Sequence, residues 1–284
     1  MKKILITGAN GQLGQSILEQ SKSCKNIECF FVTRNELDIT NESLIESYFQ
    51  DKHFDFVVNC AAYTAVDKAE DFPEDAYLVN AKATEYLAKI TNQKNIPFIH
   101  ISTDYVFDGT DSIPRKEDDK TNPIGVYGET KLDGEILAIN NNPKTIVLRT
   151  AWVYSRFGNN FVKTMLKLFK ERESLSVVND QIGSPTNALD LAKAILDIIE
   201  KEQIVYGIFN YSNEGECSWF DFANKIKEYS NSTIEINPVP SSAFPTKAKR
   251  PAYSLLDKTK IKETYQVDVP EWEISLKNEL TFIL

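Results

Sequence analysis

The first fourteen residues constrain the fold more than any other stretch of this 284-residue chain. A short apolar run, Ile4–Ile6, is followed by three glycines and then by apolar residues at helical spacing: Gly8, Gly11, Gly14, Leu13, Ile17 and Leu18. A strand, a glycine turn and a helix in this order open a parallel α/β sheet. The helix N-terminus offers free N–H groups and a partial positive charge, and glycine lets a diphosphate approach the backbone. The turn predicts a dinucleotide site, with an ordinary glycine-rich turn as the alternative.

The pattern further along the chain predicts an α/β fold, a doubly wound parallel sheet of the Rossmann type. Apolar runs indicate strands at 27–33, 54–60, 97–102 and 145–149, with helical patterns between them. After about residue 155 the alternation becomes irregular. We therefore expect a dinucleotide-binding domain over 1–155 and a smaller, mainly substrate-binding C-terminal lobe over 156–284, with later strands of the sheet contributed from 175–215.

Composition excludes several classes of function. The net charge of −9 gives no electrostatic support for binding nucleic acid. The four cysteines form no C-x-x-C pair and no cluster with histidine, so we expect free thiols in a reducing cytoplasm and no zinc. No apolar stretch approaches the roughly 20 residues of a membrane span. The sequence thus predicts a cytoplasmic protein without a nucleic-acid or membrane partner.

Residues at the carboxyl ends of the predicted strands mark the ligand crevice of such a sheet. Arg34 follows the second strand, where it suits the 2′-phosphate of NADP, although a solvated arginine is the alternative. Ala61 and Ala62 follow the third strand and leave room for a ligand. Thr103 and Asp104 follow the fourth, where substrates bind.

Two histidines and one arginine carry weaker signals. His100 lies inside an apolar run and is expected in the core, while His53 falls between elements and is expected on the surface. With only these two histidines a Ser-His-Asp hydrolase is disfavoured. Arg250 could reach a substrate diphosphate, and a plain surface arginine is an equal alternative.

Tyr127 and Lys131 lie four residues apart at the start of a predicted helix, and so on one face of it. A free tyrosine has a pKa of about 10, too high for proton transfer at neutral pH. A neighbouring ammonium favours the phenolate, so we expect Lys131 to lower the pKa of Tyr127 and to make it a general acid or base.

Together these motifs resemble the extended short-chain dehydrogenase/reductases. Within that superfamily the chain resembles the dTDP-4-dehydrorhamnose reductase family nearly from end to end. The segments that carry the closer resemblance are Ala65–Glu70, Ser102–Phe107, Val126–Lys131, Arg149–Tyr154, Gly158–Phe161 and Gly183–Thr186.

The resemblance implies reduction of the 4-keto group of a dTDP-sugar by NADPH or NADH, the last step of dTDP-L-rhamnose synthesis. It implies Tyr127 as the acid, Lys131 as the residue that lowers its pKa and holds the nicotinamide ribose, and Thr103 as the group that polarises the carbonyl. Asp104 and Trp152 would face the sugar. The implied cofactor-binding residues are Gly8, Gly11, Gln12, Leu13, Arg34, Asp38, Ile39, Ala61, Ala62, Tyr63, Thr64, Tyr127 and Lys131.

Two departures from the family pattern limit what can be carried over. Some members bind magnesium through glutamates at a dimer interface, and those positions here align with Ser16 and Leu189. We therefore doubt the metal and expect a monomer or weak homodimer. Tyr105 stands where related dehydratases carry a glutamate, which argues for plain reduction. Another nucleotide-sugar reductase or epimerase, or a non-catalytic subunit like that of methionine adenosyltransferase, are the alternatives.

Overall fold

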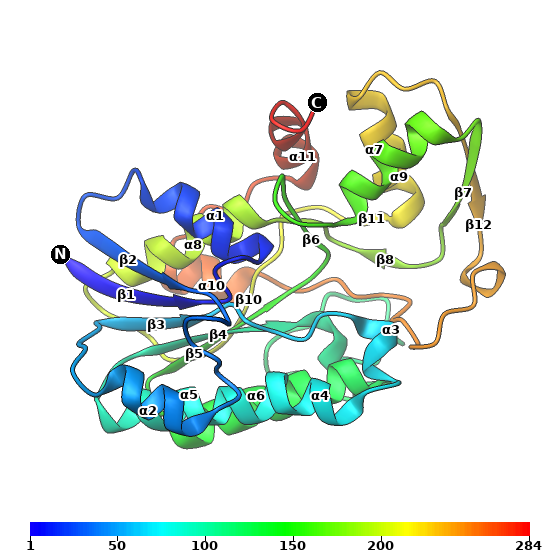
Figure 1. Cartoon of the computed structure of the whole chain (residues 1–284). Coiled ribbons are helices and arrows are strands. Elements are labelled where there is room, and N and C mark those ends of the chain that lie inside the picture. The colour runs from blue at the N-terminus through cyan, green and yellow to red at the C-terminus, as the bar shows by residue number, and fades with distance from the viewer.

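A single six-stranded parallel sheet lies at the centre of the computed structural model, which describes all residues 1–284 (Figure 1). Its order is β2–β1–β3–β4–β5–β10, and every neighbouring pair is parallel. The strands span Lys2–Thr7 (β1), Ile27–Val32 (β2), Phe56–Asn59 (β3), Phe98–Thr103 (β4), Thr145–Thr150 (β5) and Gly207–Asn210 (β10). The chain leaves β1 for β2 on one side and returns to β3 on the other, so the topological switch point lies between β1 and β3. The predicted doubly wound fold is confirmed.

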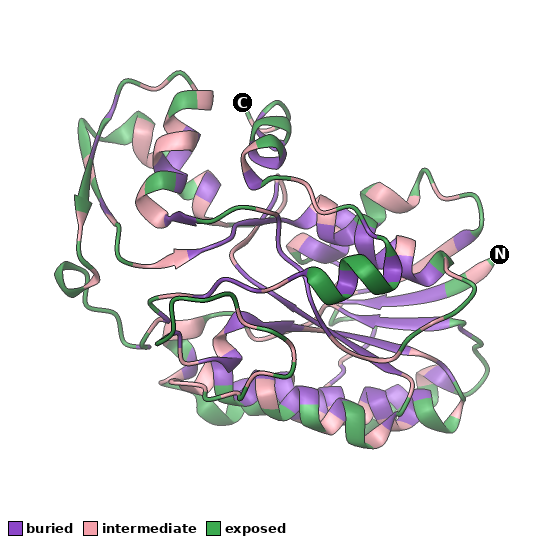
Figure 2. Ribbon diagram, turned by 180° about the vertical axis from the view of Figure 1, so that it is seen from behind, coloured by how far each residue is buried: buried purple, intermediate pink, exposed green.

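Helices cover both faces of this sheet (Figure 1). One face carries α1 (Gln12–Ser21), α8 (Ala188–Glu200) and α10 (Thr259–Tyr265), and the other carries α2 (Glu42–Phe49), α5 (Ala83–Gln93) and α6 (Val126–Asn141). Side chains of a strand alternate between faces. Ile4 and Ile6 therefore pack with α1 and α8, while Leu5 packs with α2 and α5. Burial on both faces explains the unbroken apolar run at the start of the chain (Figure 2).

Local sequence signals set several element boundaries. The Asn41 side chain caps α2 by accepting a hydrogen bond from the Leu44 N–H at 3.2 Å, as its position predicts. The helical segment that begins at Pro73 consists of α4 (Pro73–Tyr77), a π-helical turn (η1, Leu78–Lys82) and α5 in succession. His100 is fully buried and His53 is exposed, as expected. None of the helices combines the length and apolar character that crossing a bilayer requires.

A second core lies beside the sheet and is built from α7 (Phe161–Glu171), α9 (Trp219–Tyr229) and α11 (Trp272–Leu280). The parallel pair of β7 (Ser174–Val178) and β12 (Glu235–Val239) completes it. Short ladders tie this lobe together: β6 (Val153–Tyr154) with β9 (Thr186–Asn187), and β8 (Ile182–Gly183) with β11 (Cys217–Ser218). The division of the chain near residue 155 stays a prediction, since α8 and β10 return to the central sheet after it.

Three short helical segments complete the element order. They are α3 (Val66–Ala69), the 3-10 turn η2 (Asp104–Val106) directly after β4, and the 3-10 turn η3 (Ser241–Ala243). The first two lie on the connections that leave the carboxyl ends of β3 and β4. They therefore stand at the edge of the sheet where a ligand of this fold binds.

Candidate active site

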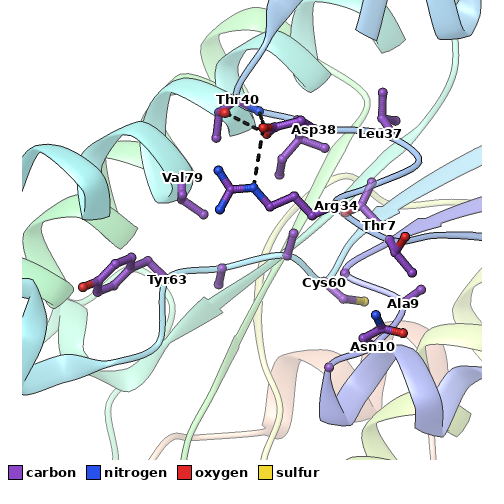
Figure 3. Close-up of a pocket in the computed structure, with 16 residues that line it drawn as sticks. Thr7, Ala9, Asn10, Arg34, Leu37, Asp38, Thr40, Cys60, Tyr63 and Val79 are labelled. Atoms are coloured by element: carbon purple, nitrogen blue, oxygen red, sulfur yellow. Dashed lines mark hydrogen bonds and ion pairs between the residues drawn. The ribbon is translucent and has the colours of Figure 1, made fainter. Parts of the chain in front are cut away.

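A cavity of about 370 Å³ opens at the carboxyl ends of β1, β2 and β3, at the switch point of the sheet (Figure 3). Of the predicted cofactor-binding residues, eight line it: Gly8, Gly11, Arg34, Asp38, Ile39, Ala61, Ala62 and Tyr63. The lining residues that sequence reasoning missed are Thr7, Ala9, Asn10, Thr33, Leu37, Thr40, Cys60 and Val79. The cavity lies where the connections from β1 to β2 and from β2 to β3 diverge to opposite sides of β1. A doubly wound sheet binds its ligand at this point.

The glycine turn brings backbone against backbone at this cavity. Gly8 has a positive φ of 68°, and a Cβ on it would lie 2.6 Å from the Ala61 amide nitrogen at the end of β3. At the start of α1 the amides of Gln12, Leu13 and Gly14 have no acceptor within the chain. Unpaired N–H groups at a helix N-terminus fit a diphosphate. These residues therefore fit a dinucleotide.

Arg34 extends along the cavity toward Asp38, and its Nε lies 3.5 Å from the Asp38 carboxylate (Figure 3). Thr40 also donates to that carboxylate from its hydroxyl at 2.7 Å, and this bond is the largest of the effects that lower the pKa of Asp38. The Arg34 side chain is 76% exposed, so its guanidinium is available to an anionic group at the mouth of the cavity.

Five predicted cofactor-binding residues lie outside the cavity lining: Gln12, Leu13, Thr64, Tyr127 and Lys131. The Gln12 side chain points to the second core, where its Nε2 donates to the Val153 carbonyl at 3.3 Å and its Oε1 accepts from Ser155 and Asn160. The Leu13 side chain is buried in the core, so only its backbone can face a ligand. Thr64 is exposed on the loop beyond Tyr63.

Asn80 positions the cavity wall. From the π-helical turn, its Oδ1 accepts from the Tyr63 N–H at 2.8 Å and its Nδ2 donates to the Tyr63 carbonyl at 3.2 Å. It is buried, and it also donates to Thr130 on α6. No sequence signal separates such an asparagine from a solvated one, because its partners lie on other elements.

Thr103 and Asp104 are buried together where β4 ends. The Thr103 hydroxyl donates to Asp104 Oδ1 at 2.9 Å and accepts from the Tyr105 N–H at 3.2 Å. Asp104 Oδ2 has no hydrogen-bond partner. Burial raises the pKa of this carboxyl to about 6, against the opposing effect of its hydrogen bonds.

The phenol of Tyr127 lies with these two residues. Its ring packs edge-on against Tyr105, with ring centroids 5.4 Å apart. Burial raises the pKa of Tyr127 to about 12, and the neighbouring Thr103 hydroxyl offsets part of the rise. The structure thus gathers Thr103, Asp104 and Tyr127 into one cluster, as the resemblance implies.

The prediction that Lys131 lowers the pKa of Tyr127 is wrong for this structure. The Lys131 Nζ donates to the Ile101 carbonyl at 2.6 Å and lies 3.4 Å from His100 Nε2, so its ammonium contacts β4 rather than the phenol. Burial lowers the pKa of Lys131 to about 8, while Glu135 and Cys60 act to raise it. Since Cys60 lines the cavity, Lys131 lies behind the cavity wall.

Trp152 lies on the connection after β5 with a positive φ of 48°. Its ring stacks on Trp219, at the start of α9, with centroids 3.6 Å apart and planes at 9°. Sequence reasoning missed Trp219, because nothing in the local pattern pairs two tryptophans on separate elements.

Arg250, which was considered as a contact for a substrate diphosphate, forms a two-point ion pair with Asp67, with its closest contact at 2.7 Å.

The fold and this site define the class as a dinucleotide-binding protein of the short-chain dehydrogenase/reductase type, with a Thr/Asp/Tyr cluster at the end of the neighbouring strand β4. The sequence matches the RmlD substrate binding domain family over residues 1–283. It is 42% identical to the dTDP-4-dehydrorhamnose reductase of Aggregatibacter actinomycetemcomitans, covering 98% of each chain.

Solved structures agree with this match. A dTDP-4-dehydrorhamnose reductase from Clostridium acetobutylicum superposes with a TM-score of 0.95 at 43% identity over 99% of each chain. One from Bacillus anthracis, in complex with NADP, has the same TM-score at 38% identity over 99% of each chain. The chain therefore belongs to the dTDP-4-dehydrorhamnose reductase family.

Proposed function

We propose that this protein reduces dTDP-4-dehydro-L-rhamnose to dTDP-L-rhamnose with NADPH or NADH. One observation carries the proposal: a phenol, a hydroxyl and a buried carboxyl, from Tyr127, Thr103 and Asp104, lie together at the end of β4, the strand next to those that end at the dinucleotide cavity. Family membership adds the substrate class, a nucleotide-linked keto sugar.

The raised pKa of Tyr127 suits reduction. A phenol with a pKa of about 12 keeps its proton at neutral pH. Reduction of a ketone produces an alkoxide, which is a stronger base than phenolate, so the proton passes from Tyr127 to the sugar oxygen downhill. The nicotinamide, when bound, supplies the hydride that creates this alkoxide.

Thr103 would contact the same oxygen, and Asp104 would bind a hydroxyl of the sugar. The Thr103 hydroxyl accepts from the Tyr105 N–H and donates its one proton to Asp104 Oδ1, so it would polarise a carbonyl by rotating that proton from the carboxylate to the substrate oxygen. Asp104 Oδ2 is buried and unpaired, which makes it a ready acceptor for a sugar hydroxyl. Lys131, one helical turn beyond Tyr127, supplies positive charge behind the cavity wall, where its ammonium donates to the Ile101 carbonyl. The resemblance to the family implies that it holds the nicotinamide ribose, which would require the ammonium to turn from that carbonyl toward the cavity.

The residues at the aligned metal positions do not fit magnesium. Ser16 is buried and its hydroxyl donates to the Gln12 carbonyl at 2.8 Å, while Leu189 has no donor atom for a metal. The proposal therefore includes no metal, and a monomer or weak homodimer. Sedimentation with and without a chelator tests this part of it.

The test of the function is turnover with NADPH and the keto-sugar nucleotide made in situ. We expect loss of NADPH absorbance in proportion to the rhamnose formed, with the product sugar identified by NMR. An epimerase would change the sugar without consuming reductant, and a binding subunit would do neither. Either outcome would reject the proposed reaction.

A further inference from the structure

We propose that Glu70, on the connection after β3, is a positioning residue that fixes the start of α6 and thereby the Tyr127 phenol. The proposal rests on the proposed function for the role of Tyr127 as the acid. Glu70 follows α3 directly, in the segment that leads away from the cavity wall at Ala61–Tyr63.

The contact between Glu70 and α6 is specific. Glu70 Oε1 accepts a hydrogen bond from the Val126 N–H at 2.9 Å. Val126 is the first residue of α6 and Tyr127 is the second. A fixed Val126 amide therefore fixes the backbone of the acid itself.

The start of α6 has no side-chain cap of its own. Gly125 occupies the N-cap position and makes no side-chain hydrogen bond. A helix start leaves backbone N–H groups unpaired and carries partial positive charge. The Glu70 carboxylate supplies both an acceptor and a complementary charge from another element. The glycine also makes room for it, because a Cβ at Gly125 would lie 2.8 Å from Glu70 Oε1.

The opposite side of α3 is also held, by hydrogen bonds and ion pairs, so the backbone at Glu70 is fixed in position. Asp67 accepts from the Ala248 N–H at 3.0 Å and pairs with the Arg250 guanidinium. Asp71 pairs with Lys247 on the same segment. The short helix α3 thus links the C-terminal segment 247–250 on one side to the acid's helix on the other.

Removing the acceptor should release the start of α6 and move the acid. A displacement of the order of 1 Å at a reacting group can lower turnover about 100-fold. We expect Glu70→Ala to lower kcat by about 10- to 100-fold, while the KM for the keto sugar and the affinity for NADPH stay within about twofold. Glu70→Gln keeps an acceptor oxygen, so it should retain kcat within about threefold.

The control is Glu74→Ala. Glu74 is an exposed glutamate on α4 whose side chain makes no hydrogen bond, so this variant should match the wild type. Turnover is expressed per NADPH-binding site, measured by fluorescence titration, so that unfolded protein does not count. The proposal is overturned if Glu70→Ala keeps the wild-type kcat, if it loses NADPH binding together with kcat, or if Glu70→Gln falls as far as Glu70→Ala.

Hydrogen exchange at residues 126–130 tests, independently of turnover, whether Glu70 anchors the start of α6. Glu70→Ala should speed exchange there, and Glu70→Gln and Glu74→Ala should not. Unchanged exchange in Glu70→Ala rejects the anchor, whatever the activity. Faster exchange in that variant, together with a wild type that has no turnover, rejects the proposed function and leaves the anchor standing.

Discussion

Gly8→Ala tests the glycine turn at the cavity most directly. Gly8 has a φ of 68°, a left-handed conformation that costs an alanine about 1–2 kcal/mol. The new Cβ would also lie 2.6 Å from the Ala61 nitrogen and 2.7 Å from the Cys60 carbonyl carbon. Both contacts are with backbone, which cannot rotate away as a side chain can.

The expected loss of stability follows from these two effects. Overpacking of this kind costs about 1–3 kcal/mol. With the backbone strain, Gly8→Ala should lower the free energy of unfolding by roughly 2–5 kcal/mol. For a chain of this size that corresponds to a decrease in Tm of roughly 4–15 °C. Because Ala61 lines the cavity, relief of the clash should also displace the wall and weaken NADPH binding by about tenfold or more, or ~1.4 kcal/mol.

Gly207→Ala is the matched control. Gly207 also has a positive φ, of 136°, but a Cβ there would meet nothing within 4 Å. It lies at the start of β10, away from the cavity. It should therefore lose stability through backbone strain without losing affinity for NADPH.

Circular dichroism melts and fluorescence titration with NADPH, on both variants and the wild type, separate the two effects. Wild-type NADPH affinity in Gly8→Ala would refute the assignment of the glycine turn to the dinucleotide. Equal losses of affinity in both variants would refute the argument from the backbone contact, since strain alone would then explain the result.

Three further predictions concern the site. Tyr127→Phe keeps the ring contact with Tyr105 and loses the acid, so turnover should fall by about 10²–10⁴-fold with NADPH affinity unchanged; full turnover would remove Tyr127 as the acid. Arg34→Ala should raise the KM for NADPH by about tenfold and leave that for NADH within about twofold; equal changes in steady-state kinetics would contradict a 2′-phosphate contact. The raised pKa of Asp104, about 6 against 3.8, gives stability that is present at low pH and lost as pH rises through 6. Asp104→Asn should therefore be more stable than the wild type by up to about 3 kcal/mol at pH 8, and most of this difference should be gone at pH 4, measured by urea unfolding; a difference independent of pH would contradict this.

The sheet was predictable because its signals are local. A buried parallel strand needs a run of apolar residues, and the strands from Ile27 and Phe98 begin within one residue of their predicted positions. The cap at Asn41 and the proline in the first turn of α4, Pro73, likewise depend only on residues close in sequence. Such features need no knowledge of the rest of the chain.

Elements of the lobe were harder to predict, because their contacts are distant in sequence. The strand β7 of the lobe was not predicted, and neither was the helix α10, which packs on the central sheet. β7 alternates between exposed and partly buried residues and is stabilised by its pairing with β12, far along the chain. The stacking of Trp152 on Trp219 has the same origin.

The error about Lys131 shows where spacing stops being informative. A separation of four residues does place Tyr127 and Lys131 on one face of α6. It does not say where a long, flexible side chain ends. The Ile101 carbonyl, at the end of β4, accepts from the ammonium, and no helical pattern encodes that acceptor.

The buried charged residues of α6 fix the position of this helix more than they stabilise the fold. Lys131 donates to the Ile101 carbonyl, and Glu135, one turn further, forms a buried ion pair with Arg149 of β5 at 2.7 Å and accepts from Ser102 of β4. Well-packed apolar residues would be about as stable as such a pair, so stability does not explain it. Apolar contacts are non-directional and tolerate sliding, whereas these bonds hold only at one register of α6 against β4 and β5. A proton donor must be held within about 0.5 Å of its acceptor's path. Directional bonds across the helix meet that requirement. One of them, to the Ile101 carbonyl, lies two residues before Thr103 and three before Asp104, the neighbours of the acid.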